Sequence, residues 1–430
     1  MTTEKLYSLY LQHPQVQTDT RKLKEGEIFF ALKGPNFNAN SFAAQALQTG
    51  AAYVVVDEET GITDTRIIKT GDVLTALQQL ALHHRKQFKI PFLAVTGSNG
   101  KTTTKELIHA VLSTTYTTYT TQGNLNNHIG IPLTLLSIKK DAELAVIEMG
   151  ANHQKEIEGY CKIALPTHGI ITNCGKAHLE GFGRIEGVRK GKGELYDFLR
   201  MNNGTAFVMN DYDYLREMSK NIPHVITYGT SGAALTGVTA ESEPFLKVKI
   251  TGGADIDTIT TQLVGDYNLP NVLAAATVGH YFKVTSPQIK AAIENYVPSN
   301  SRSQLIEKGS YKIILDAYNA NPSSMKAAIE NFARQHYTNK TLLLGGMMEL
   351  GDESIKEHES VIGLIDQYKW KDVVLVGGNF KHTAHSYHYF DNAAEAKNWL
   401  SRQQLHNGAF LIKGSRSMKM EELVTAFDAK

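Results

Sequence analysis

Residues 91–106, PFLAVTGSNGKTTTKE, constrain the fold of this chain more than any other segment. An apolar run at 92–95 is followed by a glycine-containing turn and then by residues that favour a helix. Gly97 and Gly100 allow the backbone to turn its N–H groups toward phosphate oxygens, and a helix N-terminus adds partial positive charge. We therefore predict a strand, a phosphate loop and a helix here, and with them an ATP site.

Two side chains of this loop have the chemistry that ATP requires. Lys101 can reach the terminal phosphates, and the Thr102 hydroxyl can bind Mg²⁺. The spacing is shorter than in the common GxxxxGK[ST] loop, because Val95 stands where that pattern has its first glycine. The alternative is an ordinary glycine turn with the lysine in solvent, but the strand before the loop and the threonines after it favour phosphate. The residues that we assign to ATP in this loop are Gly97, Ser98, Asn99, Gly100, Lys101, Thr102 and Thr103.

Composition excludes several classes of protein. At 430 residues the chain is too long for one core, so we expect two or three domains. A formal charge of +1 gives no basic excess for nucleic acid. Two cysteines, Cys161 and Cys174, provide no disulfide framework and suit a reducing compartment. The N-terminus lacks the apolar core of a signal peptide, and no apolar run approaches the ~20 residues needed to span a bilayer. We expect a cytoplasmic protein without a membrane span.

The order of strand-like and helix-like segments predicts three α/β domains. Residues 1–87 form a small α/β unit, and residues 88–299 alternate strands and helices as in a mostly parallel sheet. Between about 236 and 265 the alternating pattern suggests an antiparallel edge. A second strand–helix series over residues 300–430 predicts a C-terminal Rossmann-like domain.

Three residues of the second domain are candidates for metal binding or catalysis. Glu148 ends an apolar strand, and strand ends beside a phosphate loop are where ligands gather in open α/β sheets. His178 lies on a loop after another strand, as a metal ligand or a general base. Lys192 stands between two glycines in a helix, where each glycine costs about 1 kcal/mol and so indicates a close approach. Each also admits a plainer reading: a solvent-exposed glutamate, loop histidine or lysine.

Asparagines gather at two further places. The loop 122–132 contains Asn124, Asn126 and Asn127, which can bind phosphate or a substrate or simply form asparagine turns. Asn268 and Asn271 lie three residues apart at a predicted helix start, where they either present amides on one face or cap the helix.

The last domain has its own polar loop after an apolar strand. This loop contains Asp316, Tyr318 and Asn319, and Ser324 follows shortly after. Arg302 lies just past a predicted linker at 298–301, from which it can reach a nucleotide in the previous domain.

Taken together, these motifs resemble those of the Mur ligase family, the ATP-dependent amide ligases of peptidoglycan precursor synthesis. They extend over all three predicted domains. The motifs are TGSNGKTTTKE (96–106), EMGAN (148–152), NCGKAHLEGFG (173–183), GKGEL (191–195), DAYNANPSS (316–324), MMELG (347–351) and KGSRSMKME (413–421). The sequence lacks the DNPR-like motif usual in the members of this family that add diaminopimelate.

The resemblance implies a reaction. ATP phosphorylates the terminal carboxylate of UDP-N-acetylmuramoyl-tripeptide, and the amine of D-alanyl-D-alanine attacks the acyl phosphate. The alternatives are another Mur-type or folylpolyglutamate-type ligase that adds a single amino acid, and a nucleotide-binding protein without catalysis. The resemblance also implies a monomer whose first domain binds the UDP group.

The resemblance assigns roles to individual residues as well. Thr102 and Glu148 match the ligands of one Mg²⁺; Glu148, His178 and Lys192 match those around a second, and in the family the matching lysine is carbamylated. Four residues match family contacts to adenine, phosphate or ribose: Asn271, Arg302, Asp316 and Tyr318. We add the neighbouring Asn268 to the expected ATP contacts. The expected catalytic set is Lys101, Glu148, His178, Lys192, Arg302 and Asp316. The expected substrate contacts are Thr20, Arg21, Asn124, Asn126, Asn127, Asn319 and Ser324.

Overall fold

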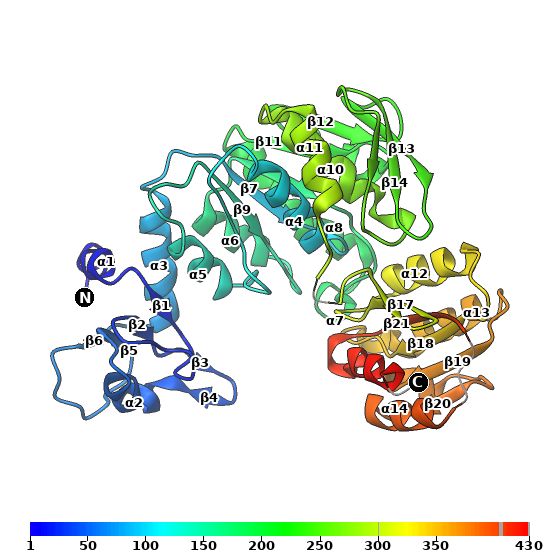
Figure 1. The fold of residues 1–430 in the computed structure, drawn as a ribbon. Coiled ribbons are helices and arrows are strands. Elements are labelled where there is room, and N and C mark those ends of the chain that lie inside the picture. The colour runs from blue at the N-terminus through cyan, green and yellow to red at the C-terminus, as the bar shows by residue number, and fades with distance from the viewer. Residues whose placement is uncertain (300, 404–406, 429–430) are drawn as a thin grey trace.

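The computed structural model describes residues 1–299, 301–403 and 407–428, and its three main sheets each belong to one domain. Figure 1 shows the central domain between the N-terminal domain, in blue, and the C-terminal domain, in yellow to red. The expected three-domain α/β architecture is confirmed.

The N-terminal domain has a sheet of four parallel strands and a separate two-stranded hairpin. The sheet order is β1 (Val16–Gln17), β2 (Ile28–Phe30), β5 (Tyr53–Val56), β6 (Ile67–Lys69), and the hairpin joins β3 (Lys33–Gly34) to β4 (Phe37–Asn38). The helices are α1 (Thr3–Gln12), a 3-10 turn at Ala39–Phe42, α2 (Ala43–Gln48) and α3 (Val73–Arg85).

The central domain contains a nine-stranded sheet that is parallel except at one edge, where β13, β14 and β15 run antiparallel. The strand order is β15 (Thr258–Thr260), β14 (Lys247–Gly252), β13 (Leu235–Glu241), β12 (His224–Gly229), β11 (Thr205–Met209), β10 (His168–Ile171), β7 (Phe92–Thr96), β9 (Leu144–Glu148), β8 (Thr118–Thr120). The helices are α4 (Lys101–Leu112), α5 (Gly130–Leu136), α6 (Glu156–Ala164), α7 (Leu179–Phe182), α8 (Ile185–Met201), α9 (Asp213–Met218), a 3-10 turn at Asp266–Asn268, α10 (Leu269–Tyr281) and α11 (Ser286–Asn295).

The C-terminal domain has a six-stranded sheet in which only the edge strand β16 is antiparallel to its neighbour. The strand order is β16 (Gln304–Lys308), β17 (Tyr311–Asp316), β21 (Gly408–Lys413), β18 (Thr341–Gly345), β19 (Asp372–Val376), β20 (His388–Phe390). The helices are α12 (Pro322–Arg334), α13 (Ser354–Ile365) and α14 (Ala393–Arg402), with 3-10 turns at Gly351–Glu353, Gly378–His382, Arg416–Met418 and Met420–Phe427.

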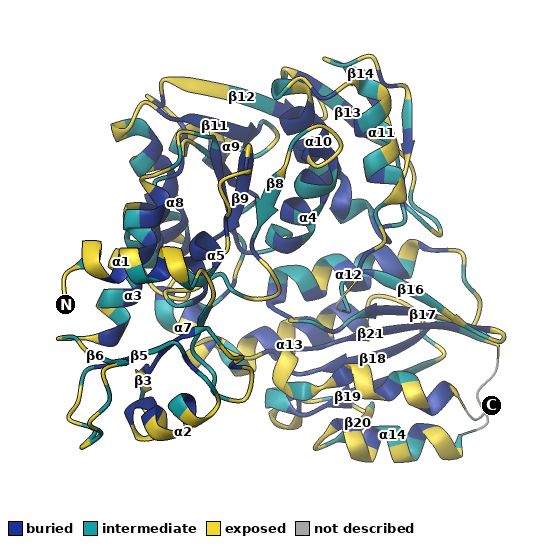
Figure 2. Ribbon diagram, turned by 60° about the vertical axis from the view of Figure 1, so that its left-hand side comes forward, coloured by how far each residue is buried: buried dark blue, intermediate teal, exposed yellow. Residues whose placement is uncertain are grey.

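The central strands are mostly apolar and fully buried because helices cover both faces of the sheet. Every residue of β7, β9 and β11 is buried, as a parallel sheet of this kind requires. Figure 2 shows β9 and β11 in dark blue, with exposed residues on outer helices and connecting loops. The polar loops at the strand ends are therefore held by a rigid core.

Helix α3 joins the N-terminal domain to the central one. It packs on α1 within its own domain and on α5 and α6 of the next. Its last residue, Arg85, is buried and donates to the carbonyls of Ala164 and Leu165 at the end of α6, at 2.7 and 2.9 Å. These bonds satisfy carbonyls that the end of α6 leaves free. The N-terminal domain is thus attached through α3, whose last residue caps the C-terminal end of α6.

Most of the predicted elements are confirmed. The alternation of strands and helices expected over residues 88–299 is present, and the antiparallel edge expected between about 236 and 265 is formed by β13–β15. The edge strands β8, β16 and β20 were missed because they are short or half-exposed and lack a continuous apolar run. Within the described residues, no helix combines the length and apolar character needed to cross a bilayer.

Candidate active site

A cavity of about 890 Å³ lies at the carboxyl edge of the central sheet and is closed on one side by the C-terminal domain. Loops that follow β7, β8, β9, β10, β11 and β12 line it, together with residues 266–271. The last domain contributes Lys413 and nine residues between 302 and 327: Arg302, Ser303, Asp316, Tyr318, Asn319, Asn321, Ser323, Ser324 and Ala327. In open α/β sheets the carboxyl ends of the strands are where ligands bind. The cavity is therefore placed where the sequence predicted a site.

The phosphate loop has the predicted form, with β7 leading through residues 97–100 into α4. Gly97 and Gly100 have φ angles of +146° and +78°, which side chains rarely adopt. A methyl group on Gly100 would lie 2.6 Å from Oδ1 of Asn271. No side chain caps α4, so the first N–H groups of the helix are available for an anion.

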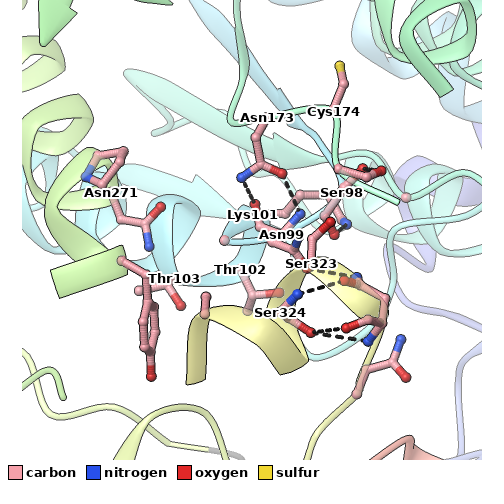
Figure 3. Close-up of a pocket in the computed structure, with 18 of the residues that line it drawn as sticks. Ser98, Asn99, Lys101, Thr102, Thr103, Asn173, Cys174, Asn271, Ser323 and Ser324 are labelled. Carbon is pink, nitrogen blue, oxygen red and sulfur yellow. Dashed lines mark hydrogen bonds between the residues drawn. The ribbon is translucent and has the colours of Figure 1, made fainter. Parts of the chain in front are cut away.

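The loop after β10 holds the phosphate loop in shape. Asn173 accepts hydrogen bonds from the N–H of Ser98, through its carbonyl at 2.9 Å, and from the N–H of Asn99, through its side chain at 3.0 Å. The Thr172 hydroxyl donates to the Asn99 carbonyl at 2.6 Å. Figure 3 shows Asn173 over Asn99, with the first turn of α12, in yellow, facing the loop. The loop is thus preorganised by side chains on a neighbouring strand end.

The ammonium group of Lys101 lies inside the loop. It donates to the carbonyls of Gly97 at 2.7 Å and Ser98 at 3.2 Å. Burial lowers the pKa of Lys101, the Glu148 carboxylate opposes this shift, and Arg302 adds to it. A nearby anion would stabilise the charged lysine, as the phosphates of a nucleotide do.

Glu148 has an unsatisfied carboxylate oxygen. The residue is 2% exposed, and its Oε1 accepts from the Asn126 amide at 2.8 Å. Its Oε2 has no hydrogen-bond partner among the described residues, although it is buried. Leaving a buried polar atom unpaired costs about 1–3 kcal/mol, and more for a charged group. A carboxylate oxygen left in this way beside a phosphate loop fits a cation ligand.

His178 and Lys192 differ in their access to the cavity. His178 lines it with a backbone φ of +52°, and its Nδ1 is 2.5 Å from the Glu349 carboxylate of the C-terminal domain. Lys192 is 1% exposed and does not line the cavity, but it donates to the carbonyl of Ala151, which does. Burial lowers the pKa of Lys192 to about 7. In the described chain, no three His, Cys, Asp or Glu side chains gather closely enough to hold a metal by themselves.

The C-terminal domain contributes two charged arrangements. The guanidinium of Arg302 stacks 3.5 Å from the centre of the Tyr318 ring. Asp316 and Lys413 end the adjacent parallel strands β17 and β21 in register, and their side chains form an ion pair at 2.6 Å. Asp316 also accepts from the N–H of Ser303 at 3.2 Å. Arg302 can bind phosphate, and the fixed Asp316 can accept a hydroxyl hydrogen bond.

Asn268 and Asn271 do not cap α10. The Asn268 amide donates to the Val264 carbonyl at 2.9 Å, and the Asn271 amide donates to Oδ1 of Asn268 at 2.8 Å. Oδ1 of Asn271 accepts from the Thr104 hydroxyl at 3.0 Å. The pair therefore ties the start of α10 to α4, and both residues still line the cavity.

The cavity brings together most of the residues predicted from the sequence. Those that line it are Ser98, Asn99, Gly100, Lys101, Thr102, Thr103, Asn126, Asn127, Glu148, His178, Asn268, Asn271, Arg302, Asp316, Tyr318, Asn319 and Ser324. Those that do not line it are Gly97, Lys192, Asn124, Thr20 and Arg21. Thr20 and Arg21 belong to the N-terminal domain, where Arg21 is paired with Asp19 at 2.8 Å.

Several cavity residues were missed. Lys413 belongs to the quoted KGSR motif but was given no role, although the parallel strands that end at Lys413 and Asp316 could have paired them. Tyr212 and Tyr214 stack with ring centres 5.6 Å apart beside the end of β11. No motif marks these tyrosines, because an aromatic residue after a strand is usually part of the core.

The chain matches known proteins over most of its length. Residues 95–279 match the family model of the Mur ligase middle domain, and residues 301–416 match that of the Mur ligase glutamate ligase domain. The chain is 35% identical to the UDP-N-acetylmuramoyl-tripeptide–D-alanyl-D-alanine ligase of Bacillus subtilis (strain 168), over 95% of this chain and 92% of that protein. It is 36% identical to the protein of the same name from Escherichia coli (strain K12), over 96% of this chain and 93% of the relative. The chain therefore belongs to the Mur ligase family.

Solved structures show the same architecture. The crystal structure of MurF from Acinetobacter baumannii covers 100% of this chain and matches over 99% of its own length, with a TM-score of 0.88 and 30% identity. The MurF ligase of Thermotoga maritima, solved in complex with ADP, has a TM-score of 0.86 and 26% identity, over 97% of this chain and 98% of its own.

Proposed function

We propose that this protein is an ATP-dependent ligase that joins D-alanyl-D-alanine to UDP-N-acetylmuramoyl-tripeptide, giving the pentapeptide, ADP and phosphate. The observation that carries the proposal is one cavity in which a phosphate loop, a buried carboxylate and a charged wall from a second domain face one another. The relatives that match nearly the whole chain bear the name of this activity. ATP is the nucleotide, in keeping with an ADP-bound relative of the same fold.

Different residues of the cavity bind the phosphates and the two acceptor substrates. The N–H groups of the phosphate loop and Lys101 hold the phosphates, and Arg302 lies on the opposite wall. The tripeptide carboxylate attacks the γ-phosphorus, ADP leaves, and the D-alanyl-D-alanine amine then attacks the acyl carbon and displaces phosphate. Positioning and charge neutralisation supply most of the catalysis in such transfers. We assign Asn126, Asn127, Asn319 and Ser324 to the two acceptor substrates because they line the same cavity.

The residues around Glu148 fit Mg²⁺. We propose that Glu148, Thr102 and His178 hold the metal, which neutralises phosphate charge when bound. The unpaired Oε2 of Glu148 supports this assignment. Calorimetric titration of the protein with Mg²⁺ and an ATP analogue, repeated with Glu148→Gln, tests it: unchanged Mg²⁺ affinity in the variant would refute the role of Glu148.

Carbamylation of Lys192 is a separate proposal. The lowered pKa of about 7 leaves much of this amine neutral near neutral pH, and the neutral amine is the form that reacts with CO₂. NMR of the protein under ¹³C-labelled CO₂ would reveal a carbamate signal that Lys192→Gln abolishes. A signal equal in both proteins, or none in either, would refute the modification at this residue.

We further propose domain boundaries at 1–87, 88–299 and 300–430, with the first domain holding the UDP group through the region of Thr20 and Arg21. Residues 300, 429 and 430 lie outside the described residues. Because ATP and UDP-linked precursors occur together in the cytoplasm, we place the reaction there.

The test is phosphate release from ATP with UDP-N-acetylmuramoyl-tripeptide and one amine at a time: D-alanyl-D-alanine, L-lysine, diaminopimelate or L-glutamate. We expect release that requires both the tripeptide and D-alanyl-D-alanine, with the pentapeptide identified by mass. Release with another amine instead would assign the chain to a different ligase of the family. If no tripeptide–amine pair gave phosphate release although ATP binds, the protein would be a nucleotide-binding protein without ligase activity.

A further inference from the structure

The loop 173–180 lies between the phosphate loop and the C-terminal domain and contacts both. On the phosphate-loop side, Asn173 accepts from the N–H groups of Ser98 and Asn99 at 2.9 and 3.0 Å. The carbonyl of Gly175 accepts from the Ser98 hydroxyl at 2.9 Å. Two consecutive backbone N–H groups of the phosphate loop are therefore fixed by this one segment, which we call the coupling loop.

On its other side, the coupling loop is held by the C-terminal domain. The N–H of Lys176 donates to the Ser323 hydroxyl at 3.0 Å, and the N–H of Glu180 donates to the Glu349 carbonyl at 3.2 Å. The Lys176 ammonium forms an ion pair with Glu357 of α13 at 2.5 Å. Two regions of the last domain, the start of α12 at Ser323 and residues 349–357, thus contact a stretch of only a few residues.

The two members of the Lys176–Glu357 pair differ in burial. The side chain of Glu357 is 6% exposed, whereas that of Lys176 is 54% exposed. Buried carboxylates are rare unless a positive group pairs with them, because desolvating an isolated charge is costly. The cation that pairs with Glu357 comes from the other domain, so separation of the domains would remove it. The pair therefore favours the docked arrangement and fixes where the coupling loop lies in it.

We infer that the coupling loop transmits docking of the C-terminal domain to the phosphate loop, and that Glu357 is a positioning residue acting through Lys176. When the last domain docks, Glu357 and Ser323 fix Lys176, and the residues before it fix the N–H groups of Ser98 and Asn99. Docking of the second domain then stabilises the binding shape of the phosphate loop further. This inference rests on the proposed function, because it assigns a role within the same ATP site.

The first test uses hydrogen–deuterium exchange of the phosphate-loop amides, residues 97–103, with a non-hydrolysable ATP analogue bound to the full-length protein. The variants are Glu357→Gln and Lys176→Met, alone and together. The matched control is Glu359→Gln, because Glu359 is exposed on the same helix. We expect faster exchange in both single variants, unchanged exchange in the control, and a double variant no worse than the more affected single one. A merely structural contact would alter overall stability without changing exchange in this loop selectively.

The second test is turnover. We expect kcat for phosphate release to fall about tenfold or more in Glu357→Gln and Lys176→Met, with a smaller change in KM for ATP, because small misplacements of reacting groups are costly. Lys176→Met keeps the test valid if Glu357→Gln fails to fold, since Lys176 is half-exposed. Exchange and kcat equal to those of the Glu359→Gln control would overturn the inference. Absence of turnover in the wild-type protein with every amine would instead refute the proposed function, and the exchange result would still decide the coupling.

Discussion

Replacing Gly100 by alanine tests whether the phosphate loop requires its observed backbone. The position has a φ of +78°, and a non-glycine residue in this region costs about 1–2 kcal/mol. The added methyl group would also lie 2.6 Å from Oδ1 of Asn271. Moving that side chain breaks its bonds to Thr104 and Asn268, each worth about 1 kcal/mol. The clash therefore adds about 2 kcal/mol to the cost of the native loop shape.

Gly26→Ala is the matched control. Gly26 has a φ of +84°, and beyond its chain neighbours a methyl group there would meet no described atom within 4 Å. It shares the backbone strain of Gly100→Ala but not the clash, and both variants gain slightly from a stiffer unfolded chain. Gly26→Ala therefore controls for an alanine at a left-handed glycine away from the nucleotide, and an Asn271→Ala background isolates the clash.

The assay is calorimetric titration with a non-hydrolysable ATP analogue. Because binding needs the native loop, the clash of about 2 kcal/mol alone corresponds to an affinity about 30-fold weaker in Gly100→Ala, and the backbone strain adds to this loss, while Gly26→Ala stays within about twofold of wild type. In an Asn271→Ala background the loss caused by Gly100→Ala should shrink, because the clashing oxygen is gone. Equal affinity in Gly100→Ala and Gly26→Ala would refute this account of the loop.

Three further outcomes follow from single contacts. Lys101→Met should lower phosphate release by orders of magnitude while the melting temperature stays near that of wild type; near-normal turnover would mean that the phosphate-loop assignment is wrong. Lys413→Met should lower the unfolding free energy in urea by about 3 kcal/mol, because it leaves Asp316 without its buried partner, and adding Asp316→Asn should recover part of the loss. Burial lowers the pKa of His168 to about 4, so the folded protein holds the imidazole neutral. The unfolded chain protonates it below about pH 6.5, so the free energy of unfolding falls by at most about 3 kcal/mol as the pH drops from 6.5 toward 4. His168→Gln should flatten that acid slope of the urea-unfolding free energy, and a slope unchanged from wild type would contradict the assignment.

The sequence was sufficient to predict the parts of the site that are built locally. The phosphate loop is one continuous segment, and its strand, glycines and helix start each leave a short-range signal. Glu148 was predicted for a similar reason, since it directly ends a buried strand. These predictions needed only the rule that parallel strands bring their carboxyl ends to one edge of a sheet.

Contacts between distant segments were beyond the sequence. Nothing near Glu349 indicates that its carboxylate meets His178, because the two are joined only by docking of one domain on another. The internal bonds of Asn268 and Asn271 were also unpredictable, since spacing alone cannot separate a ligand contact from a structural hydrogen bond. Lys192 was expected at the site, yet its ammonium lies behind Ala151.

The two neighbours of the central domain differ in how far charged pairs contribute to their attachment. Helix α3 reaches the central domain with apolar side chains packed on its core. The C-terminal domain also shares an apolar cluster with the central domain, and it adds charged pairs, among them Lys176 with Glu357 and Arg334 with Asp266. Dissolved ions screen partly exposed charges over about 10 Å at 0.1 M, whereas they leave apolar burial almost untouched. Raising the ionic strength therefore weakens the charged part of C-terminal docking, whereas the apolar contacts of both flanking domains are almost unaffected.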